Sequence, residues 1–443
     1  MPSKDGIHTL EHLQAFVDGG EYRGWAMPAY PWAVGHVVRS TGIDPLSAGY
    51  AVAVFFACAT VVPVFLLGLR MGGLRAALFS GLLWAVHPGL LRYDTDTLGM
   101  SAACFFIAAC LAALMAALEG RSLAAIWLSP AFALSAVLSR REAVSALGAV
   151  FACAAMLWAA SAARSRRHWF QPAFNLLLAA PVALLGALLT LNSLDGSFGK
   201  SVLGVGTYAA LAVGGVEEEQ DAAAQGSIGP ATTRGMIRSA SWWILPFSFW
   251  GGVRIARRGG GIPAFVLWTF AILAVLVPLA NGLAHGAGWV STRYFVPLAA
   301  GLTIVAGPGL DAAVEALRRF STAASWAGVG ILAAVCAVSG LFTAQGDTGG
   351  YREAGEYILK TYGPGQPIAS TRNQVAYFAR GHHVRLPLKD REPESGFARF
   401  VVMRLRGEAD PDARILEELG KAVRLMELRG FSDEVRLYEA FPR

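Results

Sequence analysis

The protein has 443 residues, of which 55% are hydrophobic and only 15% are charged, and its formal net charge is +6. Soluble domains usually carry about 25% charged residues, so this composition excludes an ordinary soluble protein and indicates long segments in a lipid environment. Much of the positive excess is Arg at the ends of apolar runs, which membrane topology explains without a nucleic-acid partner.

The first 45 residues precede the apolar segments and are expected to form an external loop. Polar residues follow Asp5 at helical spacings, which predicts an amphipathic helix lying on the membrane. Asp5 is a candidate catalytic carboxylate, with Tyr22 and Tyr30 as supporting residues, and the alternative is a solvated surface loop. The segment shows no signal-peptide pattern, so we expect a further transmembrane helix upstream of it.

A run of apolar segments follows, and each approaches the length needed to cross a bilayer core of ~30 Å as a helix. The seventh is short and aromatic, and only four polar residues separate the fourth from the fifth. They predict an α-helical polytopic membrane domain over residues 46–343. The expected spans are 46–69, 74–91, 97–118, 122–138, 143–160, 171–192, 240–253, 262–283, 294–311 and 323–343.

Alternate connections between these spans are short and rich in Arg, which places them in the cytoplasm. The opposite connections, with the long loop 193–239 and residues 344–443, are then external, and the protein is expected in a bacterial inner membrane. The spans carry almost no ionisable residues, whereas acids and arginines collect at the external face. The cytoplasmic arginines are Arg70, Arg75, Arg121, Arg164, Arg166, Arg167, Arg254, Arg257, Arg258, Arg318 and Arg319.

The second external loop is short and acidic. Asp94 and Asp96 lie two residues apart between two apolar segments. Hard cations prefer oxygen ligands, so this pair can share a divalent cation such as Mg²⁺ or Mn²⁺, or hold a charged headgroup. The alternative is that both residues cap the helix that follows.

Basic residues lie at three of the helix ends that are expected to face the exterior. Arg140 and Arg141, followed by Glu142, suit bidentate binding of a phosphate or pyrophosphate. The alternative is a pair of interfacial anchors that reach lipid headgroups. Arg293 and Tyr294 open the ninth span, where Arg293 can meet the same phosphate.

Motifs of several other function classes are missing from the sequence. There is no Walker-type phosphate loop, nucleophile elbow or His-Glu-x-x-His motif. His87, before Pro88, is expected at a helix end and is a further supporting candidate. The cysteines all lie in apolar runs, so neither a disulfide framework in the soluble domain nor a zinc site is expected. They are predicted to be small lipid-embedded residues: Cys58, Cys104, Cys110, Cys153 and Cys336.

Residues 344–443 have the charge content of a soluble domain, and short apolar runs alternate there with helical patterns. This pattern predicts a small extracytoplasmic α/β domain that is accessory or positions an acceptor. Helices are expected at 351–362, 375–380 and 411–423, and strands at 367–370, 384–388, 398–405 and 435–441.

Taken in order, these pieces resemble the GT-C superfamily of glycosyltransferases that use lipid-phosphate sugars. The chain is most similar to the bacterial family-39-like branch, related to protein O-mannosyltransferases and the lipid A aminoarabinose transferase. Each motif is short, but their order covers nearly the whole chain. The motifs are Asp5-Gly6, Pro28-x-Tyr30-Pro31, Ala85-x-His87-Pro88, Ser139-Arg140-Arg141-Glu142-Ala143, Arg293-Tyr294-x-x-Pro297 and Tyr351-Arg352-Glu353-Ala354-Gly355.

The resemblance implies an inverting transfer of a sugar from a polyprenyl-phosphate donor to an unknown acceptor at the external membrane face. Asp5 takes the place of the catalytic base that removes the acceptor proton, and Asp94 and Asp96 match the second acidic loop. The leaving phosphate would be neutralised by Arg140, Arg141 and Arg293.

The sequence departs from the family in two places that bear on function. Arg141 stands where relatives often have Pro, and Trp242-Trp243 is followed by Ile244 instead of Asp, so N-glycosylation is not expected. Because fold does not dictate function, a transporter or flippase, or a non-catalytic assembly subunit for lipid-linked glycans, stays open.

Overall fold

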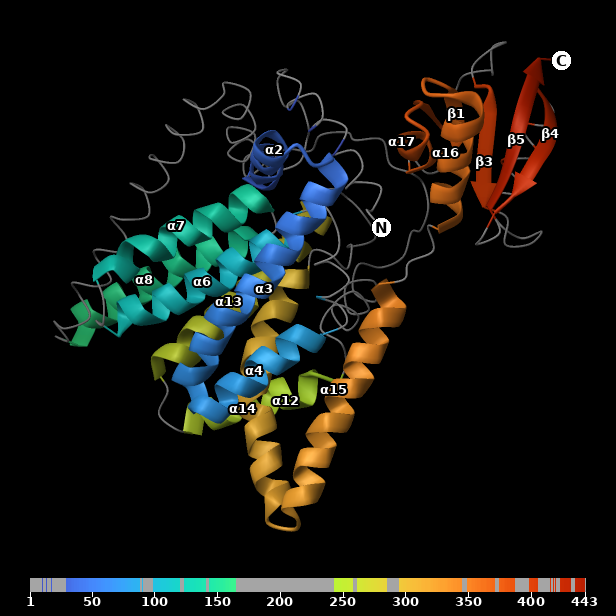
Figure 1. Ribbon diagram of the computed structural model, residues 1–443. Coiled ribbons are helices and arrows are strands. Elements are labelled where there is room, and N and C mark those ends of the chain that lie inside the picture. The colour runs from blue at the N-terminus through green and yellow to red at the C-terminus, as the bar shows by residue number, and fades with distance from the viewer. Residues whose placement is uncertain are drawn as a thin grey trace. The chain divides into compact units, whose positions relative to one another are not determined.

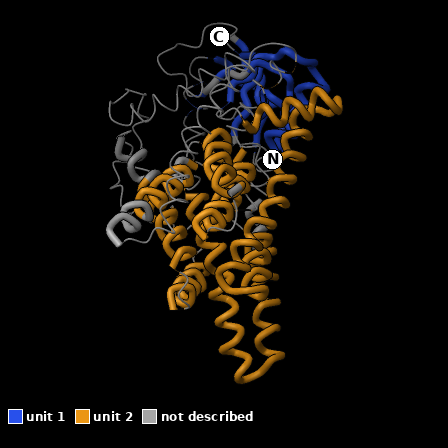
Figure 2. The backbone as a smooth tube through the Cα atoms, turned by 90° about the vertical axis from the view of Figure 1, so that its left-hand side faces the viewer, with its two compact units in different colours: residues 1–12, 345–443 blue, residues 13–344 orange. Residues whose placement is uncertain are grey.

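The chain forms two compact units, a helical unit within residues 13–344 and a smaller unit made mostly of residues 345–443 (Figure 2). The computed structural model describes residues 29–87, 99–119, 123–140, 143–164, 243–257, 261–284, 295–344, 349–370, 374–386, 398–404, 423–431 and 435–442, with Leu10, Leu13, Val17, Leu90, Ile415, Glu417 and Leu419. The expected span 171–192 and the loop 193–239 lie outside the described residues.

Each expected span that falls on described residues is a helix whose ends shift by a few residues (Figure 1). Long apolar runs form helices even where they contain Pro63, Pro130 or Pro308, since lipid leaves the backbone no partner but itself. The helices are α3 (Pro45–Gly72), α4 (Leu74–Val86), α6 (Met100–Leu118), α7 (Leu123–Ser139), α8 (Val144–Arg164), α12 (Leu245–Arg257), α13 (Gly261–Ala284), α14 (Val296–Arg318) and α15 (Thr322–Ala344).

Length and composition identify the membrane-crossing candidates among these helices. Within the described residues, three helices are long and apolar enough to span a bilayer, namely α3, α6 and α14. The apolar stretches described in α4, α7, α8, α13 and α15 are shorter. The seventh expected span is the 13-residue helix α12, which is too short to cross a bilayer core of ~30 Å by itself.

The first expected loop contains a helix that sequence patterning missed. Helix α2 (Ala29–Thr41) buries Tyr30, Val34 and Val38, which recur every four residues along one face. Pro31 obscures this signal, although proline is compatible with the first turn of a helix. Earlier in the loop, Leu10, Leu13 and Val17 are helical, in the segment where the amphipathic helix is predicted.

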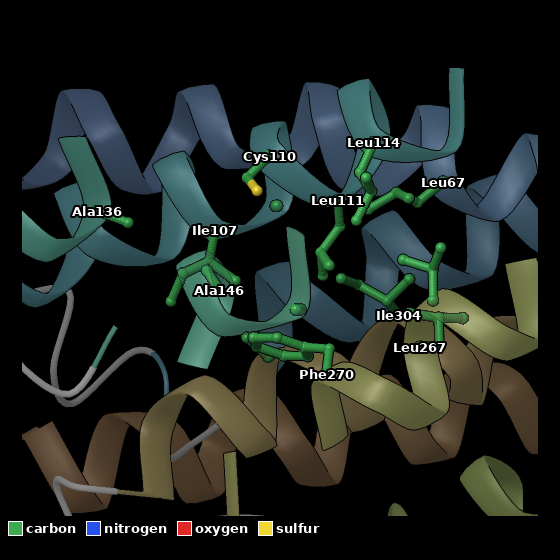
Figure 3. Close-up of a cluster of buried hydrophobic side chains, with 14 of the residues drawn as sticks. Leu67, Ile107, Cys110, Leu111, Leu114, Ala136, Ala146, Leu267, Phe270 and Ile304 are labelled. Carbon is green, nitrogen blue, oxygen red and sulfur yellow. The ribbon is translucent and has the colours of Figure 1, made fainter. Parts of the chain in front are cut away.

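The core of the helical unit lies around α6, whose side chains are mostly buried (Figure 3). Ile107, Leu111 and Leu114 of α6 meet Phe270 of α13 and Ile304 of α14 in one apolar cluster. The cysteines correct a prediction here. Cys58 alone is exposed, while the other four are buried within the protein instead of facing lipid, where their small size suits close helix packing.

Helix α14 crosses α12 and α4 at unusually close range. A Cβ atom on Gly309 would collide with the carbonyl oxygen of Phe247 in α12, and one on Gly251 would collide with the Val305 carbonyl oxygen in α14. Side-chain hydroxyls add hydrogen bonds, since Ser80 Oγ donates to the Ile304 carbonyl oxygen at 2.9 Å. Small residues and hydroxyl groups are the usual means of helix association in membranes.

The crossing leads to a prediction about stability. We expect Gly309→Ala to lower the free energy of unfolding by about 1–3 kcal/mol, because the new methyl group must separate two backbones. In Gly330→Ala on α15, the added Cβ meets no atom within 4 Å, so we expect no loss there. Unfolding in detergent–SDS mixed micelles measures both. Equal losses would mean that the contact between α12 and α14 does not limit packing.

An ionic cluster joins the same helices further along α14, and its two carboxylates depart from the expectation that the acids collect at the external face. Asp311 is buried, and its Oδ2 lies 3.1 Å from Arg254 Nη1 and its Oδ1 3.8 Å from Arg75 Nη1. Arg254 Nη2 also donates to Glu315 Oε2 at 2.9 Å. This cluster lies where the basic connections predict the cytoplasmic end of the bundle.

The smaller unit is built on a five-stranded sheet in the order β2-β1-β3-β5-β4. Strand β1 pairs in parallel with β2 and β3, whereas β5 is antiparallel to both β3 and β4. Helices α16 and α17 contribute to the apolar cluster on one face (Figure 1). The elements are α16 (Gly349–Tyr362), β1 (Pro367–Ser370), α17 (Gln374–Phe378), β2 (His382–Arg385), β3 (Phe400–Arg404), β4 (Val423–Gly430) and β5 (Val435–Pro442).

One strand of this sheet was not expected. Strand β4 follows directly on a segment predicted to be helical up to Val423, which is instead the first residue of the strand. As an edge strand it carries charged residues that interrupt the apolar alternation on which sequence prediction depends. Strand β2 begins two residues before its expected start, at His382.

Candidate functional site

Helix α2 is fixed across the end of the bundle where α3 begins (Figure 1). The hydroxyl of Tyr30, buried in α2, donates to the Gly49 carbonyl oxygen of α3 at 2.8 Å. Tyr30 was expected to support the site. This hydrogen bond shows Tyr30 fixing α2 to α3, and its role at a site stays a prediction.

Three separate segments of the chain meet at this end. Gly99 precedes α6 with φ of 71°, a left-handed conformation that glycine adopts without strain. A Cβ atom added to Gly99 would lie 2.8 Å from Tyr30 Cβ and 3.2 Å from the Ser139 carbonyl oxygen. The glycine therefore permits close contact between α2, the start of α6 and the end of α7.

Arg140 is placed at this meeting point by the end of α7. Its backbone N–H donates to the Ala136 carbonyl oxygen at 2.8 Å, and its own carbonyl oxygen accepts from Ala143 N–H at 3.1 Å. This second hydrogen bond links the end of α7 to the start of α8, and the half-buried Arg140 follows directly on Ser139, the residue that faces Gly99. The backbone of Arg140, whose guanidinium is expected to bind phosphate, is therefore held where these segments meet.

His87 ends α4 and is fully buried. Its Nδ1 accepts from the Leu90 N–H at 3.1 Å, and its ring centroid lies 6.0 Å from that of Trp243. An Nδ1 that accepts a hydrogen bond carries no proton. The expectation of a helix-end residue is confirmed, and its contacts show His87 fixing the turn after α4.

Asp44 is an acidic residue at this end that sequence reasoning did not single out. Its Oδ1 accepts from the Ser47 N–H at 3.0 Å and caps α3. Hydrogen bonds from Ser47 hold the pKa of Asp44 below its usual value. A carboxylate with a lowered pKa is a weaker base, so its role is to cap the helix. The signal for it is the Asp-Pro-Leu-Ser sequence that opens the span.

The remaining candidates cannot be placed in the same way. Ser139, the residue before Arg140, meets Gly99 beside Tyr30, and His87 lies at the end of helix α4. The other residues singled out from the sequence lie outside the described residues: Asp5, Tyr22, Asp94, Asp96, Arg141, Glu142, Arg293 and Tyr294. Their flanking elements are described, since α6 begins after the acidic loop and α14 begins after Arg293.

Within the described part of the chain, no group of three or more His, Cys, Asp or Glu side chains could hold a metal ion. The carboxylate nearest this end, Asp44, is already occupied by the α3 N-terminus. A cation site on Asp94 and Asp96, which lie outside the described residues, stays a prediction.

Solved structures match this chain over almost its full length. ArnT from Cupriavidus metallidurans in the apo state is 13% identical, with a TM-score of 0.64 over 99% of this chain and 93% of that chain. The same protein bound to undecaprenyl phosphate is 12% identical, with a TM-score of 0.62 over 99% and 94%. The oligosaccharyltransferase AglB from Archaeoglobus fulgidus, with an inhibitory peptide and a dolichol-phosphate, is 13% identical, with a TM-score of 0.55 over 91% and 66%.

The sequence itself matches no protein-family model and no curated protein. At 12–13% identity, the structural matches establish the fold. The chain has the same fold as these ArnT and AglB structures, its described residues are predominantly helical, and three of its helices are long and apolar enough to span a bilayer.

Proposed function

We propose that this protein is an inverting glycosyltransferase that moves a sugar from a polyprenyl-phosphate donor to a lipid, glycan or protein acceptor at the external membrane face. The observation that carries this proposal is the fold match over 99% of the chain to a protein whose structure holds undecaprenyl phosphate. The dolichol-phosphate in the AglB structure is a second polyprenyl phosphate on the same fold.

The convergence of α2, the start of α6 and the end of α7 supports the same proposal. These segments come together around Gly99, and each adjoins a residue expected to act on the donor or the acceptor. Arg140 follows α7 directly, and Asp94 and Asp96 precede α6 in the sequence. A site assembled from several loops at one end of a rigid bundle suits a donor held in the membrane and an acceptor that arrives from outside.

In the proposed reaction Asp5 accepts the proton of the acceptor hydroxyl while that oxygen attacks C1 of the sugar. The bond from C1 to the phosphate oxygen breaks on the opposite face, which inverts the configuration and releases polyprenyl phosphate. Negative charge grows on the phosphate as the bond breaks. Arg140, Arg141 and Arg293 stabilise that charge more strongly in the transition state than in the bound donor.

A donor panel tests this proposal. Purified full-length protein in detergent or nanodiscs is given radiolabelled polyprenyl-phosphate sugars with candidate acceptors, and release of polyprenyl phosphate is followed with time. Turnover of a donor that rises with enzyme concentration is the expected result. No turnover of any donor by folded protein would contradict the proposal.

The acidic loop allows a prediction about metal dependence in the same assay. If Asp94 and Asp96 hold a divalent cation, EDTA removes activity, Mg²⁺ or Mn²⁺ restores it, and Asp94→Asn with Asp96→Asn cannot be restored. Activity that resists EDTA but falls in the double variant would assign the two carboxylates to donor or acceptor binding without a metal. Full activity of the wild type in EDTA, together with full activity of the double variant, would mean that Asp94 and Asp96 only cap the helix that follows.

One observation favours a second candidate function, a transporter or flippase for lipid-linked glycans. Transporters keep ionisable residues inside the bundle, and the buried Asp311–Arg254 pair is such a feature. Reconstituted vesicles with a fluorescent lipid-linked glycan separate the two functions, because a flippase moves the lipid between leaflets without breaking the sugar–phosphate bond.

A further inference from the structure

In the smaller unit, helix α16 covers only part of one face of the sheet. Leu437 of β5 packs in the apolar cluster beneath α16, and its partner in the register is Arg429 of β4. Paired residues of antiparallel strands share a face. The next pairs on that face are Glu439 with Met426 and Phe441 with Arg424. We call Arg424, Met426, Arg429 and Phe441 the β4–β5 face.

This face combines exposed apolar side chains with arginine. Met426 is 47% exposed and Phe441 37% exposed, while Arg424 and Arg429 are also exposed. The Arg429 guanidinium lies 5.0 Å from the Tyr357 ring centroid and 5.4 Å from that of Phe431. Surfaces that bind at a membrane interface combine exposed apolar side chains with basic residues and partly buried aromatic rings.

The charges of the two sheet faces differ. On the opposite face, Arg436 Nε lies 3.7 Å from Glu427 Oε1, which neutralises it. Among the described residues, Arg424 and Arg429 contact no carboxylate, and Arg429 stacks only on rings. The one carboxylate of β5 on this side of the sheet, Glu439, is neutralised by Arg399, whose Nε lies 3.2 Å from Glu439 Oε1. Arg424 and Arg429 therefore leave the β4–β5 face with a net positive charge that is complementary to an anionic surface.

The chain keeps this unit close to lipid. Helix α15, an apolar helix of the membrane unit, ends at Ala344, and α16 begins at Gly349. A fully extended chain covers at most about 3.6 Å per residue, so the start of α16 lies within roughly 18 Å of the end of α15. The smaller unit is thus tethered to an apolar helix by a short link, and basic side chains experience the surface charge of a bilayer within a Debye length of about 10 Å.

We propose that the β4–β5 face docks on the bilayer, with Met426 and Phe441 in the headgroup layer and Arg424 and Arg429 bound to anionic lipid phosphates. This inference needs no assumption about the reaction, so it stands or falls apart from the proposed glycosyl transfer. Docking would attach the smaller unit to the bilayer in addition to its covalent link to α15. The β4–β5 face would then be the side of the unit that contacts lipid.

The test uses the full-length protein in nanodiscs, with Cys58→Ala removing the exposed native thiol. An environment-sensitive fluorophore is attached at Met426→Cys or, as the matched control, at the neighbouring Glu427→Cys on the opposite face. The discs contain either phosphatidylcholine alone or phosphatidylcholine with phosphatidylglycerol, and a spin-labelled lipid serves as the quencher.

We expect the probe at position 426, and not the one at 427, to be quenched and blue-shifted in discs with phosphatidylglycerol. Arg424→Glu and Arg429→Glu should each weaken docking roughly fivefold, because each basic residue near an anionic surface contributes about that factor. High salt should weaken it as well. Circular dichroism confirms that the variants are folded.

Equal quenching of the two probes, or quenching at position 426 that ignores lipid charge and both arginine variants, would overturn the proposal. Spontaneous cross-linking through position 426 in unlabelled Met426→Cys, with no quenching by lipid, would overturn it too, because the face would then cover a second copy of the chain.

Discussion

Replacing Asp5 with Asn is expected to lower transfer by about a hundred- to ten-thousand-fold, the usual contribution of a general base. The amide has nearly the size of the carboxylate but cannot accept the acceptor proton. In the proposed mechanism the arginines bind the donor phosphate, so the donor Kd should change little while kcat falls. Turnover and equilibrium binding of a polyprenyl-phosphate sugar, measured on the same preparations, separate the two effects.

Asp44→Asn is the matched control for this experiment. Asp44 is another aspartate of the segment that precedes α3, but its carboxylate caps α3 through Ser47. Asn caps a helix about as well as Asp, so we expect fold and turnover to persist. A large loss of turnover in Asp44→Asn with none in Asp5→Asn would transfer the role of base to Asp44. Wild-type turnover in both variants would mean that neither carboxylate is the base that accepts the proton.

The helical architecture was predictable from the sequence because lipid imposes one rule on every segment. An apolar run of sufficient length must satisfy its own backbone as a helix, so the spans at α3, α6, α7 and α14 follow from hydropathy. The rule does not apply at the interface. There α2 forms because Tyr30, Val34 and Val38 are buried along one face, a tertiary cause that a short segment with Pro31 near its start conceals.

The candidate site was predictable only in part. Arg140 and His87 were found by chemistry, since charge and imidazole at helix ends stand out in an apolar sequence. Gly99 was missed because a glycine carries no chemical signal, and its importance comes from the 2.8 Å at which a Cβ would approach Tyr30. Contacts between distant segments decide such positions, and no local pattern records them.

Asp311→Ala is expected to be the most destabilising single change in the helical unit, at about 3–5 kcal/mol, because it leaves Arg254 charged and mostly buried without its main partner. The Arg254 side chain is only 14% exposed, and it reaches Asp311 at 3.1 Å and the exposed Glu315 at 2.9 Å. Glu315 remains in the variant, but its side chain is 56% exposed and its attraction is screened by water.

Glu315→Ala distinguishes a buried ion pair from a general effect of charge at this end of the bundle. It removes a carboxylate from the same guanidinium, at a shorter distance, and should cost less than about 1 kcal/mol because that pair is solvated. The free energy of unfolding of both variants in mixed micelles gives the comparison. A similar small loss in both would show that water reaches Arg254. The Asp311 cluster would then be an ordinary surface feature, and the argument that buried charge favours a transporter would lose its support.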